Sequence, residues 1–142
     1  MLKGVDPLLA PDLLHVLARM GHGDEIALVD RNFPAASVGR QVVRLDGCDL
    51  PTAARAILSV LPLDTFVEQP LAAMQVVGKP DEVPEVQQDV FSIAEQVEQR
   101  GIGVERVERF AFYERARSAF AVVATSEPRP YGCVLLIKGV IF

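Results

Sequence analysis

The sequence predicts an α/β protein with a single domain over residues 1–142, in which helices lie on both faces of a mixed sheet. Short apolar runs alternate with amphipathic segments over most of the chain. The length of 142 residues is that of one ordinary domain, and half of the residues are apolar, which is enough for a sizeable core. Only a turn separates the last two apolar runs, so we expect part of the sheet to be antiparallel. The predicted architecture is a layered α/β/α domain.

The first third of the chain predicts one helix and two strands. Apolar residues recur at helical spacing over residues 9–20, and Gly21 is expected to end this helix in the left-handed conformation. The short apolar run 26–29 then predicts a buried strand. Residues 32–39 are expected to form a loop, and residues 41–45 a further strand.

The middle of the chain predicts two helices around a central strand. Asp49 is a suitable cap for a helix that Pro62 ends. The run 71–77 is apolar on both faces, which is typical of a strand inside the sheet. Pro84 opens a long amphipathic helix, and Gly101 marks its end.

The last third of the chain predicts three strands and one helix. Residues 104–107 form a short strand that leads into a helix continuing to about residue 118. The runs 119–124 and 134–137 predict buried strands, and a turn rich in proline and charge separates them.

Composition and charge exclude several classes of partner. The formal net charge is −5, which argues against nucleic acid because phosphate binding needs a basic surface. The longest apolar run, residues 119–124, is far too short to cross a bilayer, and the first residues have no apolar signal core. Cys48 and Cys133 make no disulfide framework and no four-ligand metal site. We therefore expect a cytoplasmic protein with reduced thiols and without metal, membrane or nucleic-acid contacts.

The first candidate site is His22 together with Asp30. His22 lies between two glycines just before the strand 26–29, and Asp30 follows that strand directly. Histidine titrates near neutrality and is the usual side chain for proton transfer, while ligands of open α/β sheets bind beyond the carboxyl ends of strands. The alternative is equally open at this point: His22 is then a solvated loop residue and Asp30 a turn former.

Two further polar clusters stand at the ends of elements, where binding groups concentrate. Arg109 and Tyr113 are four residues apart and share a helix face. Tyr131 and Gly132 precede the last strand. Such groups suit a neutral polyol and transfer protons without a cofactor. From the residues alone, Arg109 is better explained by surface pairing with a nearby glutamate, and Tyr113 by a place in the core.

Three stretches resemble the ribose pyranase/fucose mutarotase family, and within it the fucose mutarotase branch. They are Met20-Gly21-His22-Gly23-Asp24-Glu25-Ile26, Asp30 with Asn32-Phe33-Pro34, and Arg109-Phe110-Ala111-Phe112-Tyr113-Glu114-Arg115-Ala116. The resemblance continues through residues 120–123, 131–132 and 138–139, so that it covers nearly the whole chain.

The resemblance implies an α/β fold of the ribose pyranase type that assembles into rings, often a decamer of two pentamers, with smaller assemblies in animals. It implies an isomerase without a cofactor that interconverts the α and β anomers of a free monosaccharide, most readily L-fucose. D-ribose pyranase activity is the sister function, and a sugar-binding protein without catalysis is the third alternative.

Carried over by the matching motifs, His22 corresponds to the general acid, and Asp30 and Arg109 correspond to sugar-binding positions. Tyr131, Gly132 and Cys133 correspond to the C-terminal binding segment, and Tyr131 is also a candidate for proton transfer at the anomeric hydroxyl. The family usually has asparagine at the position of Cys133, so the sugar preference is the property that this departure affects. Phe33 or Tyr113 is a candidate to cover the apolar face of the sugar.

Overall fold

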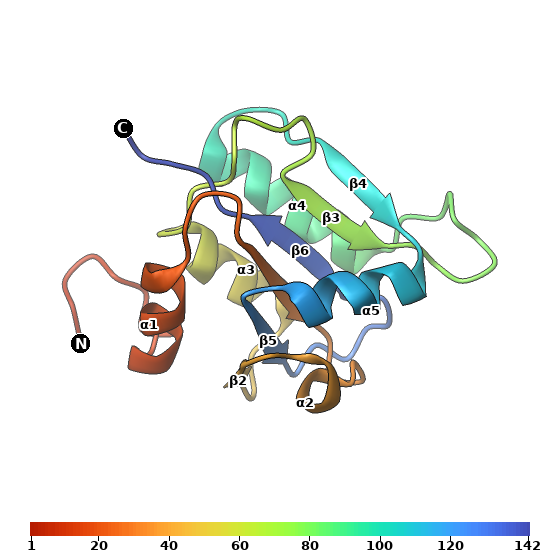
Figure 1. Ribbon diagram of the computed structural model, residues 1–142, viewed down its shortest axis with the longest axis horizontal. Helices are drawn as coiled ribbons and strands as arrows, with labels where there is room; N and C mark the ends of the chain where they lie inside the picture. Colours follow the sequence, from red (N-terminus) through yellow and green to blue (C-terminus); the bar gives the residue numbers. More distant parts are fainter.

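The computed structural model describes all residues, 1–142, and contains one six-stranded sheet with helices on both faces (Figure 1). The strands are β1 (Glu25–Val29), β2 (Val42–Leu45), β3 (Leu71–Met74), β4 (Val104–Val107), β5 (Ala121–Thr125) and β6 (Val134–Ile137). The helices are α1 (Pro11–Arg19), α2 (Ala35–Val38), α3 (Leu50–Leu58), α4 (Glu85–Glu98) and α5 (Arg109–Ser118). No helix is both long enough and apolar enough to span a membrane. The predicted layered α/β fold with a mixed sheet is confirmed.

Five strands of the sheet run in the same direction, and β6 runs against them. The strand order is β2-β5-β1-β6-β3-β4, and β6 is antiparallel to both of its neighbours, β1 and β3. The antiparallel part of the sheet was predicted, but β5 and β6 are not neighbours, because β1 lies between them. The carboxyl ends of the five parallel strands and the amino end of β6 therefore meet at one edge, which we call the carboxyl edge. The opposite side of the sheet is the amino edge.

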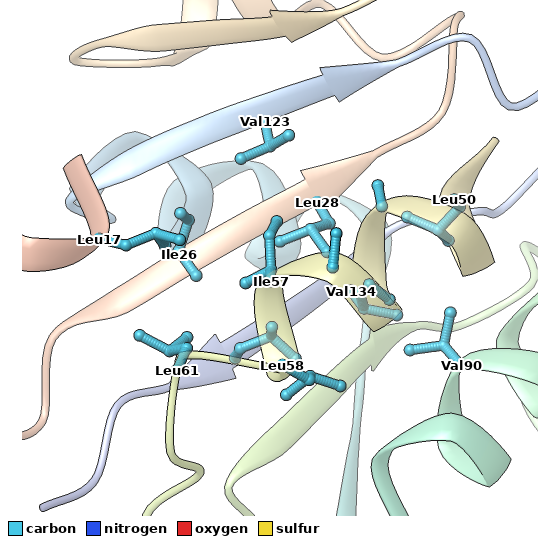
Figure 2. Close-up of a cluster of buried hydrophobic side chains, with 14 of the residues drawn as sticks. Leu17, Ile26, Leu28, Leu50, Ile57, Leu58, Leu61, Val90, Val123 and Val134 are labelled. Carbon is cyan, nitrogen blue, oxygen red and sulfur yellow. The ribbon is translucent and has the colours of Figure 1, made fainter. Parts of the chain in front are cut away.

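Alternation along the strands divides the core into two layers. Ile26 and Leu28 of β1 point into the larger cluster, which α1, α3 and α4 cover, while Ala27 and Val29 point into the smaller cluster under α2 and α5. Figure 2 shows the larger cluster, in which Ile57 of α3 lies close to the strand side chains. Both faces of β1 are buried. Polar side chains next to this strand can therefore reach solvent only beyond its two ends, at the edges of the sheet.

Three local expectations differ from the structure. The predicted loop 32–39 contains the short helix α2. The strand predicted over residues 71–77 ends at Met74, because β4 ends opposite it at Val107 and β6 has no residue paired beyond Ala73. Gly21 is not left-handed; Gly23 takes that conformation instead, with φ +85°, and so turns the chain into β1.

Candidate active site

A pocket of about 280 Å³ opens at the carboxyl edge and collects most of the predicted site residues. Its lining comprises Asp30, Asn32, Phe33, Met74, Arg109, Tyr113, Pro130, Tyr131 and Cys133. These residues come from the ends of β1 and β3, the start of α5 and the segment before β6. The topology explains their meeting, since all these element ends lie at the same edge of the sheet. Four predicted binding residues, Asp30, Arg109, Tyr131 and Cys133, therefore line a single pocket.

The carboxylate of Asp30 ties two loops of the pocket together. Its side chain is buried, and Oδ1 accepts from the backbone N–H groups of Asn32 (3.0 Å) and Phe33 (3.1 Å). Oδ2 accepts from the N–H of Gly132 (3.1 Å) and from the thiol of Cys133 (3.5 Å). Burial raises the pKa of Asp30, and these hydrogen bonds oppose the rise without cancelling it. Asp30 thus holds the 131–133 segment against the end of β1.

Gly132 and Cys133 act on the pocket through Asp30. Gly132 does not line the pocket and contributes its backbone N–H to the carboxylate. The Cys133 side chain is buried, and burial, followed by the charge of Asp30, raises the pKa of its thiol well above the ordinary value. The thiol is therefore protonated and serves as a weak donor. An asparagine at this position would offer a stronger donor and also an acceptor.

Arg109 and Tyr113 form an aromatic and cationic wall of the pocket. Arg109 Nε donates to the Tyr113 hydroxyl at 3.2 Å, and its guanidinium lies 5.4 Å from the centre of the Tyr113 ring. The same guanidinium lies 5.2 Å from the ring centre of Phe110. Phe33 packs edge-on against Tyr113 with 5.1 Å between ring centres. Phe33 and Tyr113 both line the pocket, so each is placed to cover an apolar surface of a ligand.

The alternative that Arg109 makes an ordinary surface ion pair is wrong. Glu105 is paired with Arg115, which also pairs with Glu25. The carboxylate of Glu108 instead caps α5 by accepting from the N–H groups of Phe110 and Ala111. Both candidate partners are thus occupied, and the Arg109 guanidinium keeps N–H donors for a ligand.

Tyr131 is held in an unusual backbone conformation. Its φ is +61°, a region that residues other than glycine rarely adopt and that costs about 1–3 kcal/mol. Its carbonyl accepts from Gln87 Nε2 at 2.8 Å, and its hydroxyl accepts from the N–H of Val77 at 3.2 Å. The phenol O–H keeps its hydrogen for another acceptor, so Tyr131 can donate into the pocket that it lines.

His22 lies at the amino edge of the sheet, in contact with two residues of the segment between α3 and β3. Its Nε2 donates to Asp64 Oδ1 at 3.0 Å, and the Phe66 ring meets the imidazole edge-on with 4.8 Å between ring centres. The His22 side chain stays 39% exposed, whereas that of Asp64 is 3% exposed. His22 is therefore a solvent-exposed loop residue, as the alternative interpretation held, and a buried carboxylate orients its imidazole.

Hydrogen bonds hold Asp64 in its charged form. Burial opposes ionisation, but donors from the Phe66 N–H and from His22 outweigh it, and the pKa of Asp64 is lowered. Because Asp64 is ionised at neutral pH, His22 Nε2 carries the hydrogen of this bond. The nitrogen of His22 that remains free to exchange a proton is Nδ1.

The chain just after β6 joins the His22 loop to the Asp64 segment. Gly23 N–H donates to the Lys138 carbonyl at 2.8 Å, and Lys138 N–H donates to the Asp24 carbonyl at 2.9 Å. On the other side, Asp64 N–H donates to the Ile137 carbonyl at 3.0 Å. These backbone bonds explain how residues 42 positions apart in sequence form one histidine–aspartate pair.

The two candidate groups that the sequence suggested as one cluster are separated in the folded chain. His22 precedes β1 and Asp30 follows it, and the five residues of β1 alone span about 16 Å. The grouping of His22 with Asp30 is therefore wrong within a single chain, since side chains at opposite ends of a strand do not meet. No three His, Cys, Asp or Glu side chains stand close enough to hold a metal ion.

Comparison with known proteins places the chain in a family. The sequence model of the RbsD / FucU transport protein family matches residues 3–141. The chain belongs to the RbsD/FucU family. The resemblance found in the sequence is thereby confirmed over almost its full length.

Members of the RbsD/FucU family with known names or structures agree with this assignment. The fucose mutarotase of Homo sapiens is 49% identical, and the alignment covers 99% of this chain and 94% of the human protein. The structure of the fucose mutarotase from Streptococcus pneumoniae in complex with L-fucose is similar with a TM-score of 0.92 at 37% identity, covering 99% of this chain and 100% of the other. RbsD of Bacillus subtilis, complexed with D-ribose, has a TM-score of 0.72 at 23% identity over 100% of both chains, which shows a shared fold.

Sequence reasoning missed Asp64 and Gln87. Asp64 lies behind the candidate residue His22, and Gln87 lies behind the candidate residue Tyr131. Asp64 stands in a segment without periodicity between α3 and β3, and nothing local indicates its burial. Gln87 falls within the amphipathic helix predicted after Pro84, and it stands on the buried side of α4 at 0% exposure. A polar residue in the apolar stripe of α4 was the one available signal.

Proposed function

We propose that the chain interconverts the α and β anomers of free L-fucose by general acid–base catalysis without a cofactor. The observation that carries the proposal is the pocket at the carboxyl edge, which gathers Asp30, Arg109 and Tyr131 in a relative of the human fucose mutarotase. An anionic acceptor, a cationic donor and a phenol together match the hydroxyl groups of a monosaccharide. The aromatic walls match its C–H surface.

The reaction requires two proton transfers. Opening the hemiacetal breaks the bond between C1 and the ring oxygen, which gains a proton as the anomeric hydroxyl loses one. The C1 carbonyl then turns and the ring oxygen attacks its other face, with the two protons moving back. A positioned acid or base typically contributes about 10²–10⁴-fold to such a step. The proposal assigns the ring-oxygen proton to His22 and the anomeric proton to Tyr131 or a water beside it.

The pairing with Asp64 suits His22 to this role. The Asp64 carboxylate at 3.0 Å fixes the ring plane and holds the hydrogen on Nε2, so that Nδ1 is the nitrogen left to exchange a proton with the sugar. The part of the imidazole that remains exposed is available to a sugar that approaches from outside the subunit.

Apart from Tyr131, the pocket residues would bind the sugar rather than transfer protons. Arg109 donates to a hydroxyl through N–H groups that no carboxylate occupies. Asp30 already accepts from three backbone N–H groups, so a sugar hydroxyl would take the position of the weak Cys133 thiol on Oδ2. Cys133 would then tune the sugar preference through Asp30.

A complete site would need two subunits. One sugar cannot touch both His22 and the pocket of the same chain, because about 16 Å of β1 lies between them. We propose that His22 of one subunit meets the pocket of its neighbour in a head-to-tail ring, in which two different surfaces of the chain join. The assembly that we propose is a decamer of two pentamers or a smaller ring.

Exposed apolar side chains at both edges support such an interface. Phe66, which packs on His22, is 67% exposed, and Ile141, which shares a cleft with His22, is 80% exposed. Beside the pocket, Phe110, which contacts Arg109, is 64% exposed, and Val77, which donates to the Tyr131 hydroxyl, is 60% exposed. Large apolar side chains left in water on two separate surfaces favour an association that buries both.

The two alternatives have weaker support. The similarity to the D-ribose complex of RbsD is at 23% identity and concerns the fold, whereas the relatives at high identity are fucose mutarotases. The oriented His22 favours catalysis over a binding protein without it, because a buried carboxylate fixes which ring nitrogen is free. Cytoplasmic placement is part of the proposal and is consistent with two free cysteines.

The test is exchange NMR of the anomeric protons of L-fucose and of D-ribose, with and without the purified protein. Faster α/β exchange of L-fucose supports the proposal, and the variant His22→Ala should lose that acceleration while still binding the sugar. Acceleration for D-ribose alone would move the chain to the sister activity. Binding without acceleration for either sugar would favour the binding protein, and wild-type exchange rates in His22→Ala would refute the role of His22.

A further inference from the structure

Gln87 is a fully buried side chain behind the pocket that the proposed mechanism does not use. It stands in the first turn of α4, is 0% exposed and does not line the pocket. Its Nε2 donates to two carbonyls, that of Met74 at 2.7 Å and that of Tyr131 at 2.8 Å. Met74 and Tyr131 both line the pocket. One amide therefore holds the backbone of two lining residues that lie far apart in sequence.

The orientation of the Gln87 amide follows from its third partner. Arg106 Nη1 donates to Gln87 Oε1 at 2.8 Å, and the guanidinium of Arg106 is fixed in turn by a bond from Nη2 to the Glu82 carbonyl at 3.2 Å. A guanidinium can only donate, so the amide oxygen must face Arg106 and the NH₂ group must face the two carbonyls. Each hydrogen-bonding atom of the Gln87 side chain has a specified partner.

The hydrogen bond from Gln87 to the Tyr131 carbonyl affects the pocket, because Tyr131 lines it. Tyr131 has φ +61°, a conformation that persists only where the surroundings impose it. Gln87 holds its carbonyl, and Asp30 holds the next peptide through the Gly132 N–H. The direction in which Tyr131 points therefore depends on a helix residue that a ligand never touches.

We propose that Gln87 is a positioning residue of the sugar pocket, which sets the backbone of Tyr131 and Met74 by donating to both carbonyls. The inference rests on the proposed function, because it assumes that Tyr131 and its neighbours bind the sugar. It adds a residue that acts through others and makes α4 part of the site.

The variant Gln87→Glu tests the proposal directly. It keeps the volume and the contact with Arg106, but a carboxylate cannot donate to the two carbonyls and repels them. Displacing pocket groups by about 1 Å costs on the order of 10²-fold in catalysis, so we expect kcat/KM for L-fucose to fall by about 10- to 100-fold. The sugar dissociation constant should rise with it.

A spectroscopic readout separates positioning from general loss of stability. The sequence has two tyrosines and no tryptophan, so fluorotyrosine labelling gives two fluorine NMR signals, which a Tyr113→Phe sample assigns. Gln87→Glu should shift the Tyr131 signal in the folded protein.

Gln41→Glu is the matched control. Gln41 Nε2 also donates to a backbone carbonyl, that of Phe120 at 2.8 Å, but just before β2 and β5 at the amino edge. We expect this variant to leave both the Tyr131 signal and L-fucose binding unchanged.

Each outcome decides the matter. A folded Gln87→Glu protein with wild-type affinity and an unmoved Tyr131 signal would overturn the inference. Should that variant not fold, Gln87→Met, which has a similar length and no donor, takes its place with the same two readouts. Should the wild type bind neither sugar, the proposed function fails, and the Tyr131 signal alone then supports or overturns the positioning role.

Discussion

Asp30 has a role at the residue scale that its motif does not reveal. All four of its donors come from the loops of the pocket, three of them backbone N–H groups. A carboxylate has about four lone-pair sites, so its acceptor capacity is almost fully used before any ligand arrives. Asp30 therefore shapes the pocket before any ligand is bound.

The Asp64 carboxylate should control both stability and catalysis. In Asp64→Asn the neutral amide no longer fixes which nitrogen of His22 carries the hydrogen, and we expect kcat to fall by about 10²-fold, within the usual contribution of an acid. Because the folded pKa of Asp64 is lowered, its stabilising effect is present above the ordinary pKa of 3.8 and disappears as pH falls through the folded value. Denaturant unfolding of wild type and Asp64→Asn, repeated at intervals of about one pH unit from pH 7 into the acid range, measures this pH dependence of stability.

The stability difference between wild type and Asp64→Asn should be largest at neutral pH and vanish in acid. A difference that stays constant across the range would show that the charge of Asp64 contributes nothing to folding.

Gly139 should be intolerant of a side chain because it touches the Asp64 segment. A Cβ at this position would lie 2.7 Å from the Leu63 carbonyl oxygen and 2.8 Å from the Asp64 Cα. Gly139→Ala should therefore cost about 1–3 kcal/mol of unfolding free energy and reduce anomer exchange by displacing Asp64. Gly101→Ala is the control, since nothing lies within 4 Å of its Cβ. Equal stability of the two variants would contradict this prediction.

At the element scale, the N-terminus of α5 sets the position of Arg109. The Glu108 carboxylate caps the helix by accepting from the N–H groups of Phe110 (2.9 Å) and Ala111 (3.1 Å). Glu108→Ala should cost about 1 kcal/mol of stability and also weaken L-fucose binding, because Arg109 is the first residue of the helix.

A second helix cap provides the comparison for α5. Asp49 caps α3 by accepting from the Thr52 N–H at 2.9 Å, and neither residue lines the pocket. Asp49→Ala should cause a similar loss of stability and no loss of affinity. Calorimetric titration with L-fucose distinguishes the two variants, and unchanged affinity in Glu108→Ala would show that α5 does not depend on its cap.

At the scale of the whole molecule, the placement of β6 decides where the site forms. It lies between β1 and β3 and brings Cys133 and the preceding Tyr131 to the carboxyl ends of both strands. Its other end carries Lys138 to the His22 loop. One antiparallel strand thus supports the pocket at one edge and the histidine–aspartate pair at the other.

Mixing two inactive variants tests whether the complete site spans two subunits. His22→Ala and Arg109→Ala should each be inactive, but random co-assembly of equal amounts puts an intact His22 against an intact pocket at about a quarter of the interfaces. Anomer exchange should then return to about a quarter of the wild-type rate. Co-refolding followed by exchange NMR measures the recovery, and native mass spectrometry gives the size of the assembly.

Recovery of activity on mixing would place the site between subunits. Inactivity of the mixture, in assemblies shown to contain both variants, would contradict a shared site.

The sequence by itself determined the α/β class, the order of the elements except for the short helix α2, and the candidate binding residues at the carboxyl edge. These follow from local causes: apolar periodicity, caps such as Asp49, and the rule that strand ends carry ligands. Asp30, Arg109 and Tyr131 could be selected as candidate site residues because each stands at the end of an element. The resemblance to a family then indicated sugar binding as their shared function.

Only the tertiary structure decided which of these groups meet. Three features join residues that lie far apart in the chain: β6 pairs with β1, Asp64 is buried behind His22, and Gln87 donates to the Tyr131 carbonyl. The separation of His22 from Asp30 likewise follows from the length of an extended β1 between them. Hydrogen bonds across a sheet depend on strand order, which no local pattern encodes, and that is why the partners of the candidate residues became visible only in the folded chain.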